Sequence, residues 1–146
     1  MNHFRRSIIA FKTLPPVLTL LLLLAGPNVA SAQRHDMMVR LSEIEIEPVH
    51  LEQYKAILAE ESAASVKLEP GVVAIFPMYQ KETPTSVRIL EIYASKAAYE
   101  QHIKSPHFQT YKTTTLPMVK SLKLVDMTAI DPATMPLLFR KISAKN

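Results

Sequence analysis

The chain of 146 residues contains no cysteine and only two glycines. Without a thiol it can form no disulfide, no thiolate nucleophile and no cysteine-linked lipid anchor. Stability must therefore come from a packed core or from association between chains. Beyond residue 32 the sequence also lacks an apolar run near the roughly 20 residues that a membrane-spanning helix needs. We expect no stable membrane insertion of that part.

The first 32 residues have the composition of a signal peptide. Basic residues precede a leucine-dominated apolar core and a small-residue cleavage site, at Arg5, Arg6 and Lys12, residues 17–25, and Ala30-Ser31-Ala32. We expect cleavage after Ala32 and export of residues 33–146 to the periplasm or the medium. The arginine pair also fits twin-arginine export, but the residues around it do not match that pattern, so an ordinary basic start is favoured.

Positive charge is in small excess, and much of this excess lies in the expected signal peptide. The whole chain has 17 Lys and Arg against 13 Asp and Glu. Three basic residues and no acidic ones precede the cleavage site, which leaves 14 against 13 in residues 33–146. A nearly neutral chain lacks the basic surface typical of nucleic-acid binding, so we expect no such partner. The remaining length fits one domain.

Residues 33–37 should form a flexible lead-in. After cleavage, the amine of Gln33, two backbone amides and the His35 imidazole would offer four nitrogens to Cu(II) or Ni(II). This spacing often arises by chance, and Gln33 can cyclise. A tail without metal is therefore the favoured interpretation, and a metal site at His35 is the alternative.

Strand-like segments rich in β-branched and aromatic residues alternate with helical patterns in the rest of the chain. The order βαββαβ that they form is the ferredoxin-like pattern of an α+β fold, an antiparallel sheet with its helices on one face. The domain spans residues 38–127, and residues 128–146 form a C-terminal arm. We predict strands at residues 38–47, 71–80, 86–93 and 119–127, and helices at residues 51–67 and 95–115.

Three local predictions follow from single residues. Gly71, at the end of the turn Glu69-Pro70-Gly71, is the residue expected to hold a positive φ. Pro77 cannot donate to a sheet ladder, so its strand should lie at an edge or bulge there. In the first helix, Glu60 and Glu61 should lie on the solvated side.

The second and third strands are apolar on both faces. Two helices in one layer can cover only one face of an antiparallel sheet, so the other apolar face would stay exposed. A symmetric homodimer that packs sheet on sheet would bury it. In the second strand, one face carries Val72, Ala74, Phe76 and Met78, and the other carries Val73, Ile75 and Tyr79. In the third strand, one face carries Val87, Ile89 and Tyr93, and the other carries Leu90 and Ile92.

The stretch from residue 87 to residue 108 joins a strand to a helix that carries a histidine. Ser95 can cap the helix, because its hydroxyl can accept from a free amide of the first turn. Tyr99, His102 and Ile103 then lie at i, i+3 and i+4, on one face. Pro106 should break the helix just afterwards.

This stretch resembles the antibiotic biosynthesis monooxygenase family, which includes small bacterial quinol monooxygenases. The run E-I-Y-x-S-x-x-A-Y-x-x-H-x-x-S-P-H-F over residues 91–108 and L-E-P-G-V over residues 68–72 carry the similarity, which extends over roughly residues 37–127. The resemblance implies a dimeric α+β barrel. It also implies oxygenation of a small quinol or phenol by O2 with no flavin, haem or metal cofactor.

A base near neutrality would help this chemistry, because a quinol ionises near the pKa of tyrosine, about 10. His102 stands where the family motif places its histidine. The candidate residues are His102 as base; Tyr79 and Tyr93 to orient substrate oxygens; Phe76, Met78 and Phe108 as walls; and, in second rank, His107 and Glu91. Structural roles are also open: a satisfied core or surface histidine for His102, a cap or surface residue for His107, ordinary core for the tyrosines and Met78, and a half-buried, hydrogen-bonded carboxylate for Glu91.

Other functions on the same fold are also open. Haem-degrading relatives use an asparagine in the first strand, a tryptophan in the second helix and a histidine ligand. This chain has no tryptophan, no asparagine in its first strand, and Lys112 at the ligand position, so that activity is not expected. Isomerisation of a small ketone, with His102 as base, and non-catalytic binding of an apolar ligand in the periplasm are the alternatives.

Overall fold

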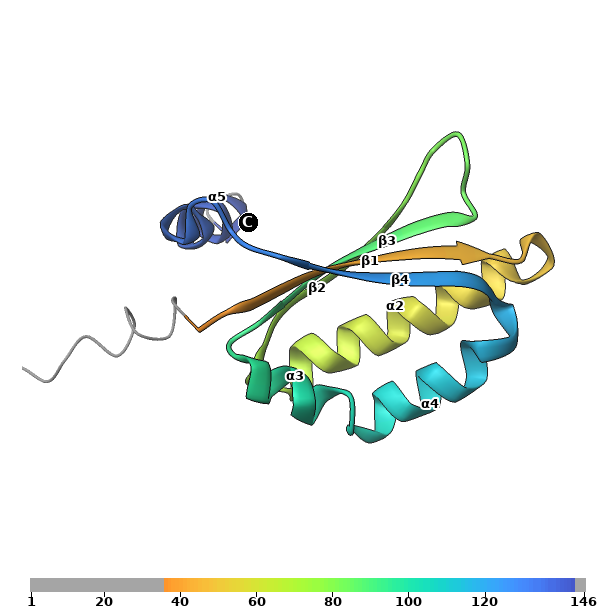
Figure 1. Ribbon diagram of the computed structural model, residues 1–146, viewed down its shortest axis with the longest axis horizontal. Coiled ribbons are helices and arrows are strands. Elements are labelled where there is room, and N and C mark those ends of the chain that lie inside the picture. The colour runs from red at the N-terminus through yellow and green to blue at the C-terminus, as the bar shows by residue number, and fades with distance from the viewer. Residues whose placement is uncertain (1–35, 144–146) are drawn as a thin grey trace, which may run out of the picture.

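A four-stranded antiparallel sheet forms the centre of the structure, a computed structural model in which residues 36–143 are described (Figure 1). Its strands are β1 (Met38–Ile46), β2 (Val72–Tyr79), β3 (Ser86–Tyr93) and β4 (Val119–Met127), in the order β2-β3-β1-β4. The predicted ferredoxin-like α+β fold is confirmed. The predicted signal peptide and the metal hypothesis at His35 lie outside the described residues.

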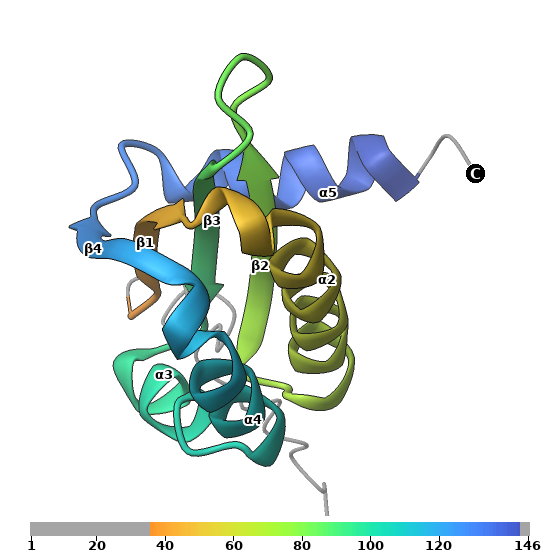
Figure 2. The ribbon, with the colours of Figure 1, turned by 90° about the vertical axis from the view of Figure 1, so that its right-hand side faces the viewer.

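Three helices cover one face of this sheet: α2 (Leu51–Leu68), α3 (Lys96–His102) and α4 (Pro106–Thr115) (Figures 1 and 2). Short 3-10 turns flank them at η1 (Pro48–His50) and η2 (Leu116–Met118). The arm contains a further turn, η3 (Pro132–Thr134), and a helix that the sequence did not predict, α5 (Met135–Ser143). Figure 1 shows α5 on the opposite side of the sheet from α2. Within the described part of the chain, no helix has both the length and the apolarity to cross a bilayer.

Serine caps set the ends of the two short helices. The Ser95 hydroxyl accepts from the amide of Ala98 at 3.2 Å and begins α3, as predicted. A second cap, at Ser105, accepts from the amide of Phe108 and begins α4, with Pro106 in its first turn. The predicted break before Pro106 is confirmed, because proline at this position favours an extended conformation at the preceding serine.

The strand pairing explains which side chains face the helices. Partners across an antiparallel ladder share a face, and β1 pairs Ser42 with Ile89 and Ile44 with Val87. The helix-facing side of β1 is therefore buried, and its other side is only half buried. Strand β2 lies at the edge of the sheet, as Pro77 predicted, and carries a register shift near its start.

Gly71 has a different role from the predicted one. No glycine among residues 36–143 has a positive φ, so that prediction is wrong. A Cβ built on Gly71 would instead lie 2.6 Å from the Cβ of Ala98 in α3. Glycine is needed here because the chain before β2 passes against α3 with no room for a side chain.

The apolar residues separate into a buried core and an exposed outer face. The core lies between the sheet and the helices and consists of Ile44, Ile46, Tyr54, Leu58, Val87, Ile89 and Met118. On the other side of the sheet, Phe76, Met78 and Met127 are 59, 40 and 49% exposed. A single chain therefore leaves an apolar sheet face open to solvent, as the two-sided strand pattern predicted.

Candidate active site

A cavity of about 560 Å³ lies between the helix-covered face of the sheet and the helices. Its walls are mostly apolar, with a smaller set of polar and titratable side chains among them. The apolar lining includes Ile44, Leu58, Ile75, Ile89, Ile103, Phe108, Leu122 and Leu124, and the polar lining includes Arg40, Ser42, Glu61, Glu91, Tyr93, Tyr99, His102 and Tyr111. A cavity of this size and composition fits a small organic molecule with a few polar atoms.

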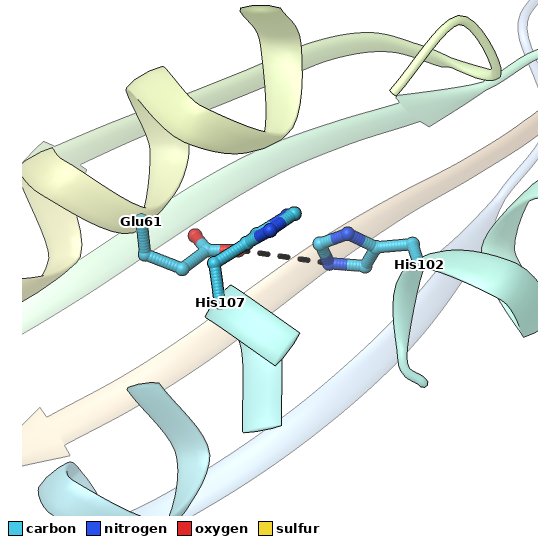
Figure 3. A group of neighbouring side chains, drawn as sticks. All are labelled: Glu61, His102 and His107. Atoms are coloured by element: carbon cyan, nitrogen blue, oxygen red, sulfur yellow. Dashed lines mark ion pairs between the residues drawn. The ribbon is translucent and has the colours of Figure 1, made fainter. Parts of the chain in front are cut away.

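His102 is the last residue of α3 and one of the most buried side chains of the described chain, at 2% exposed. Its Nδ1 lies 2.9 Å from Oε1 of Glu69, and its Nε2 lies 3.8 Å from Oε1 of Glu61. Figure 3 shows the imidazole and the Glu61 carboxylate pointing toward each other, the first from α3 and the second from α2. Glu69 thus holds the ring at Nδ1, and Nε2 faces Glu61 where both side chains line the cavity.

Glu69 follows directly after α2 and binds both histidines. Its Oε1 lies 2.6 Å from Nε2 of His107, which also contacts the Ser105 hydroxyl at 3.1 Å. A carboxylate can only accept, so the network assigns Nδ1 of His102 and Nε2 of His107 as the donors. In the neutral imidazole of His102, Nε2 then has a free lone pair and can accept a proton from a bound molecule.

Glu61 is a buried carboxyl group on the same helix. Its side chain accepts from the Ser65 hydroxyl at 2.7 Å, and the residue is only 6% exposed. Burial raises the pKa of this carboxyl, and the Ser65 hydrogen bond and the neighbouring His102 partly oppose that shift. The hypothesis that Glu61 faces solvent is wrong, because it lies three residues after Leu58 and seven after Tyr54 on the buried face of α2.

A second cluster of polar side chains lies on the helix-covered face of the sheet, where it lines the cavity. Arg40 pairs with Asp126 at 2.7 Å and lies 4.5 Å from the centre of the Tyr99 ring. Beside it, Glu91 accepts from Ser42 at one oxygen and from the Tyr93 hydroxyl, at 2.8 Å, at the other. Both Glu91 oxygens are thus engaged with neighbouring hydroxyls, whereas Nε2 of His102 has no hydrogen bond among the described residues.

The structure brings some of the candidate residues together and separates others. Tyr93 is fully buried, and Phe108 packs on His102 with ring centres 4.7 Å apart; both line the cavity. Phe76 and Met78 project from the opposite face of the sheet, since they alternate with the inward-facing Ile75. Tyr79 is half exposed at the end of β2 and does not line the cavity.

The sequence analysis did not identify the charged residues Glu61, Arg40 and Glu69 as part of the site. Glu61 could have been found from its helical spacing to Leu58 and Tyr54. Arg40 lies in phase with Ile44 in β1, which signals an inward side chain. Glu69 has no such signal, because a residue at a helix end binds side chains 33 and 38 positions away.

Comparison with known proteins places the chain in a family. The model of a family described as antibiotic biosynthesis monooxygenase matches residues 37–114, more than half of the chain. The protein belongs to this family. A structure from Bacteroides thetaiotaomicron, of a provisionally assigned antibiotic biosynthesis monooxygenase, is 50% identical with a TM-score of 0.67, over 68% of this chain and 95% of that one.

Other solved structures have a similar fold. A provisionally assigned monooxygenase from Lactobacillus acidophilus is 27% identical, with a TM-score of 0.62, over 64% of this chain and 44% of that one. One from Nitrosomonas europaea is 20% identical, with a TM-score of 0.62, over 66 and 92% of the two chains, which supports the fold alone. No curated protein matches the sequence.

Proposed function

We propose that the exported chain, residues 33–146, is a cofactor-independent monooxygenase of a small quinol or phenol, with His102 as its general base. One observation carries this proposal. An almost fully buried imidazole, fixed by a carboxylate at Nδ1, presents Nε2 at the wall of a largely apolar cavity. Family membership supports a monooxygenase, and the site supplies the base that a phenolic substrate needs.

The reaction needs no external reductant. Nε2 of His102 takes the phenolic proton, and the electron-rich anion transfers an electron to O2. For a hydroquinone, the products are a hydroxyquinone, which gains one oxygen atom, and water, which contains the other. The substrate supplies all four electrons that reduce O2, so atoms and electrons balance without a flavin or a metal.

The two carboxylates assist the proton transfer. Glu69 holds the imidazole at Nδ1 and would stabilise the imidazolium that forms. Glu61, 3.8 Å from Nε2, lies close to the transferred proton. The aromatic ring of Phe108 and the surrounding aliphatic side chains keep water from the reactive intermediate.

The functional unit in this proposal is a homodimer. The outer sheet face exposes Phe76, Met78 and Met127, and a symmetric partner that packs sheet on sheet would cover them. The covered face is the one away from the cavity, so each chain would keep its own site on its helix side. Export and cleavage after Ala32 belong to the same proposal.

Oxygen uptake tests the activity. Purified residues 33–146 are mixed with a panel of quinols and phenols, with no cofactor added. His102→Ala should reduce kcat at least about tenfold, as expected for loss of a general base. His50→Ala is the matched control. His50 lies just before the N-terminal end of α2, and the site residue Glu69 lies beyond the opposite end of that helix, so His50 is remote from the His102 network.

The outcome separates the proposal from its rivals. Equal turnover by wild type and His102→Ala would refute the role of the base. If wild type and His102→Ala are both inactive but folded, and phenols raise their melting temperatures, the protein is a binding protein. A ligand that binds only the folded state raises its stability. Conversion of a small ketone without oxygen uptake would indicate an isomerase.

A further inference from the structure

Three helices bring a carboxylate and two imidazoles to one point. One ligand atom from each of Glu61, His102 and His107 lies within 4.8 Å of those of the other two, and the three side chains converge in Figure 3. Glu69 accepts from Nδ1 of His102 and from Nε2 of His107, so the lone pairs of the neutral rings are on Nε2 of His102 and Nδ1 of His107. Two imidazole nitrogens and one carboxylate oxygen form a donor set that suits divalent transition metals such as Zn²⁺. We propose that this cluster is a binding site for a divalent transition-metal ion, which competes with the substrate proton for Nε2 of His102.

The spacing of the donors supports this assignment. Nε2 of His102 and Oε1 of Glu61 are 3.8 Å apart, too far for a hydrogen bond. Two ligands of a tetrahedral zinc ion, with bonds near 2.0–2.2 Å, are separated by roughly 3.4 Å. Closing this pair around an ion needs a shift of about 0.4 Å by the same estimate. A small side-chain rotation suffices for this pair, and the ligand atom of His107, within 4.8 Å of the other two, would have to approach further.

The groups around the cluster have the arrangement of an outer coordination layer. Glu69 accepts from Nδ1 of His102, which fixes the tautomer with Nε2 available. A histidine that binds a metal commonly donates its other nitrogen to a carboxylate in this way. The Ser65 hydroxyl donates to Glu61 and holds that carboxylate in turn.

Charge also favours a cation at this point. Glu61 and Glu69 together contribute two negative charges when ionised, in a region where both are largely shielded from water. A divalent ion would compensate that charge, which is otherwise costly to bury. Glu61 and His102 line the cavity, so an ion could reach these two side chains from it.

The test is a zinc titration of the purified protein after treatment with a chelator. Competition with a chromophoric chelator should show one tight site per chain. Glu61→Gln and His107→Gln should each weaken binding by at least about 100-fold, and Glu69→Gln by roughly tenfold, as expected for loss of an outer partner. The controls are His50→Ala and His35→Ala, both of which should leave the affinity unchanged.

Zinc is the probe because the four-nitrogen terminus predicted at His35 prefers copper and nickel. Failure of wild type to bind zinc, or binding that is lost only in His35→Ala, would overturn the proposal. If a variant does not fold, X-ray absorption of the zinc-bound wild type decides. It should show two imidazole nitrogens at about 2.0–2.1 Å, and a shell of oxygen atoms alone would refute the site.

Zinc binding is measured without substrate, so this test does not depend on the proposed activity. Only the competition between zinc and the substrate proton rests on the proposed function. If both are correct, zinc should inhibit oxygen uptake, and the chelator should restore it. Zinc binding by an inert protein would refute the oxygenase alone, and turnover by a protein that binds no zinc would refute the metal site alone.

Discussion

Replacing Gly71 by alanine tests the packing that positions the site. The added Cβ would lie 2.6 Å from the Cβ of Ala98, where ordinary van der Waals contact is 3.4–4 Å. The carbonyl of Gly71 also accepts from the amide of Ala94 at 2.8 Å, which ties it to the chain just before α3. The contact can relax only if α3 moves away, and His102 is the last residue of that helix.

The expected loss of stability can be worked out from two opposing effects. Overpacking of this kind costs about 1–3 kcal/mol, and replacing glycine stabilises by about 0.4–1 kcal/mol through the unfolded chain. We therefore expect Gly71→Ala to lower the free energy of unfolding by about 1–2 kcal/mol. Ala98→Gly alone should cost at most about 1 kcal/mol of helix propensity.

The double variant isolates the contact. With Ala98→Gly the facing methyl group is gone, so Gly71→Ala should no longer destabilise. The two changes should then couple by about 1–3 kcal/mol in favour of the double variant. Urea unfolding followed by circular dichroism measures all four proteins. Oxygen uptake should fall in Gly71→Ala, by up to about 10²-fold if His102 moves by an ångström, and should recover in the double variant.

Two results would refute this reasoning. A Gly71→Ala protein within 0.5 kcal/mol of wild type, about the scatter of a neutral surface change, would mean that α3 has room to adjust. Additive effects in the double variant would mean that Ala98 is not the group that the new methyl meets.

Three further predictions concern other parts of the molecule. The hydroxyls of Tyr54 and Tyr111 are 2.7 Å apart, and burial raises both pKa values, that of Tyr111 to about 12. Because the folded state then binds more protons than the unfolded one above pH 10, stability should be full below about pH 10 and fall as the pH rises toward 12. Tyr54→Phe should flatten that fall in urea unfolding at pH 9 and 11, and an unchanged slope would contradict the assignment. Glu69→Gln should lower kcat about tenfold with KM nearly unchanged, because the catalytic imidazole loses the group that orients it; steady-state oxygen uptake measures both, and an effect on KM alone would count against it. Phe76→Asp should convert the proposed dimer to monomers in light scattering, whereas Thr113→Asp, at an exposed helix position, should not; a monomeric wild type would remove the basis of this prediction.

The elements themselves could be predicted closely from the sequence. The final strand at Val119–Met127 was predicted at the observed residues, and α2 was predicted to within a residue at its end. Both carry strong local signals, alternation in one and helical spacing in the other. The helix α5 was missed because two prolines, Pro132 and Pro136, indicated an irregular arm; Pro136 lies in its first turn, where proline is tolerated.

The site depended on contacts that no local pattern contains. His102 could be singled out from the motif and from its helical face, and its role as base stays a prediction. Its partners Glu61 and Glu69 were assigned to solvent and to a turn, since charged residues usually belong there. Their actual places follow from α2 packing against the sheet while its end meets the start of α4.

The sequence by itself determined the order of strands and helices, the break at Pro106, and an apolar pattern too extensive for one chain to bury. These features follow from residues near each other in the chain, whose spacing and backbone preferences act locally. The tertiary structure alone decided which titratable groups meet. It places Glu69 on both His102 and His107, turns Glu61 inward and brings α3 against Gly71. Such contacts depend on how whole helices pack on the sheet, which the residues within any one segment do not specify.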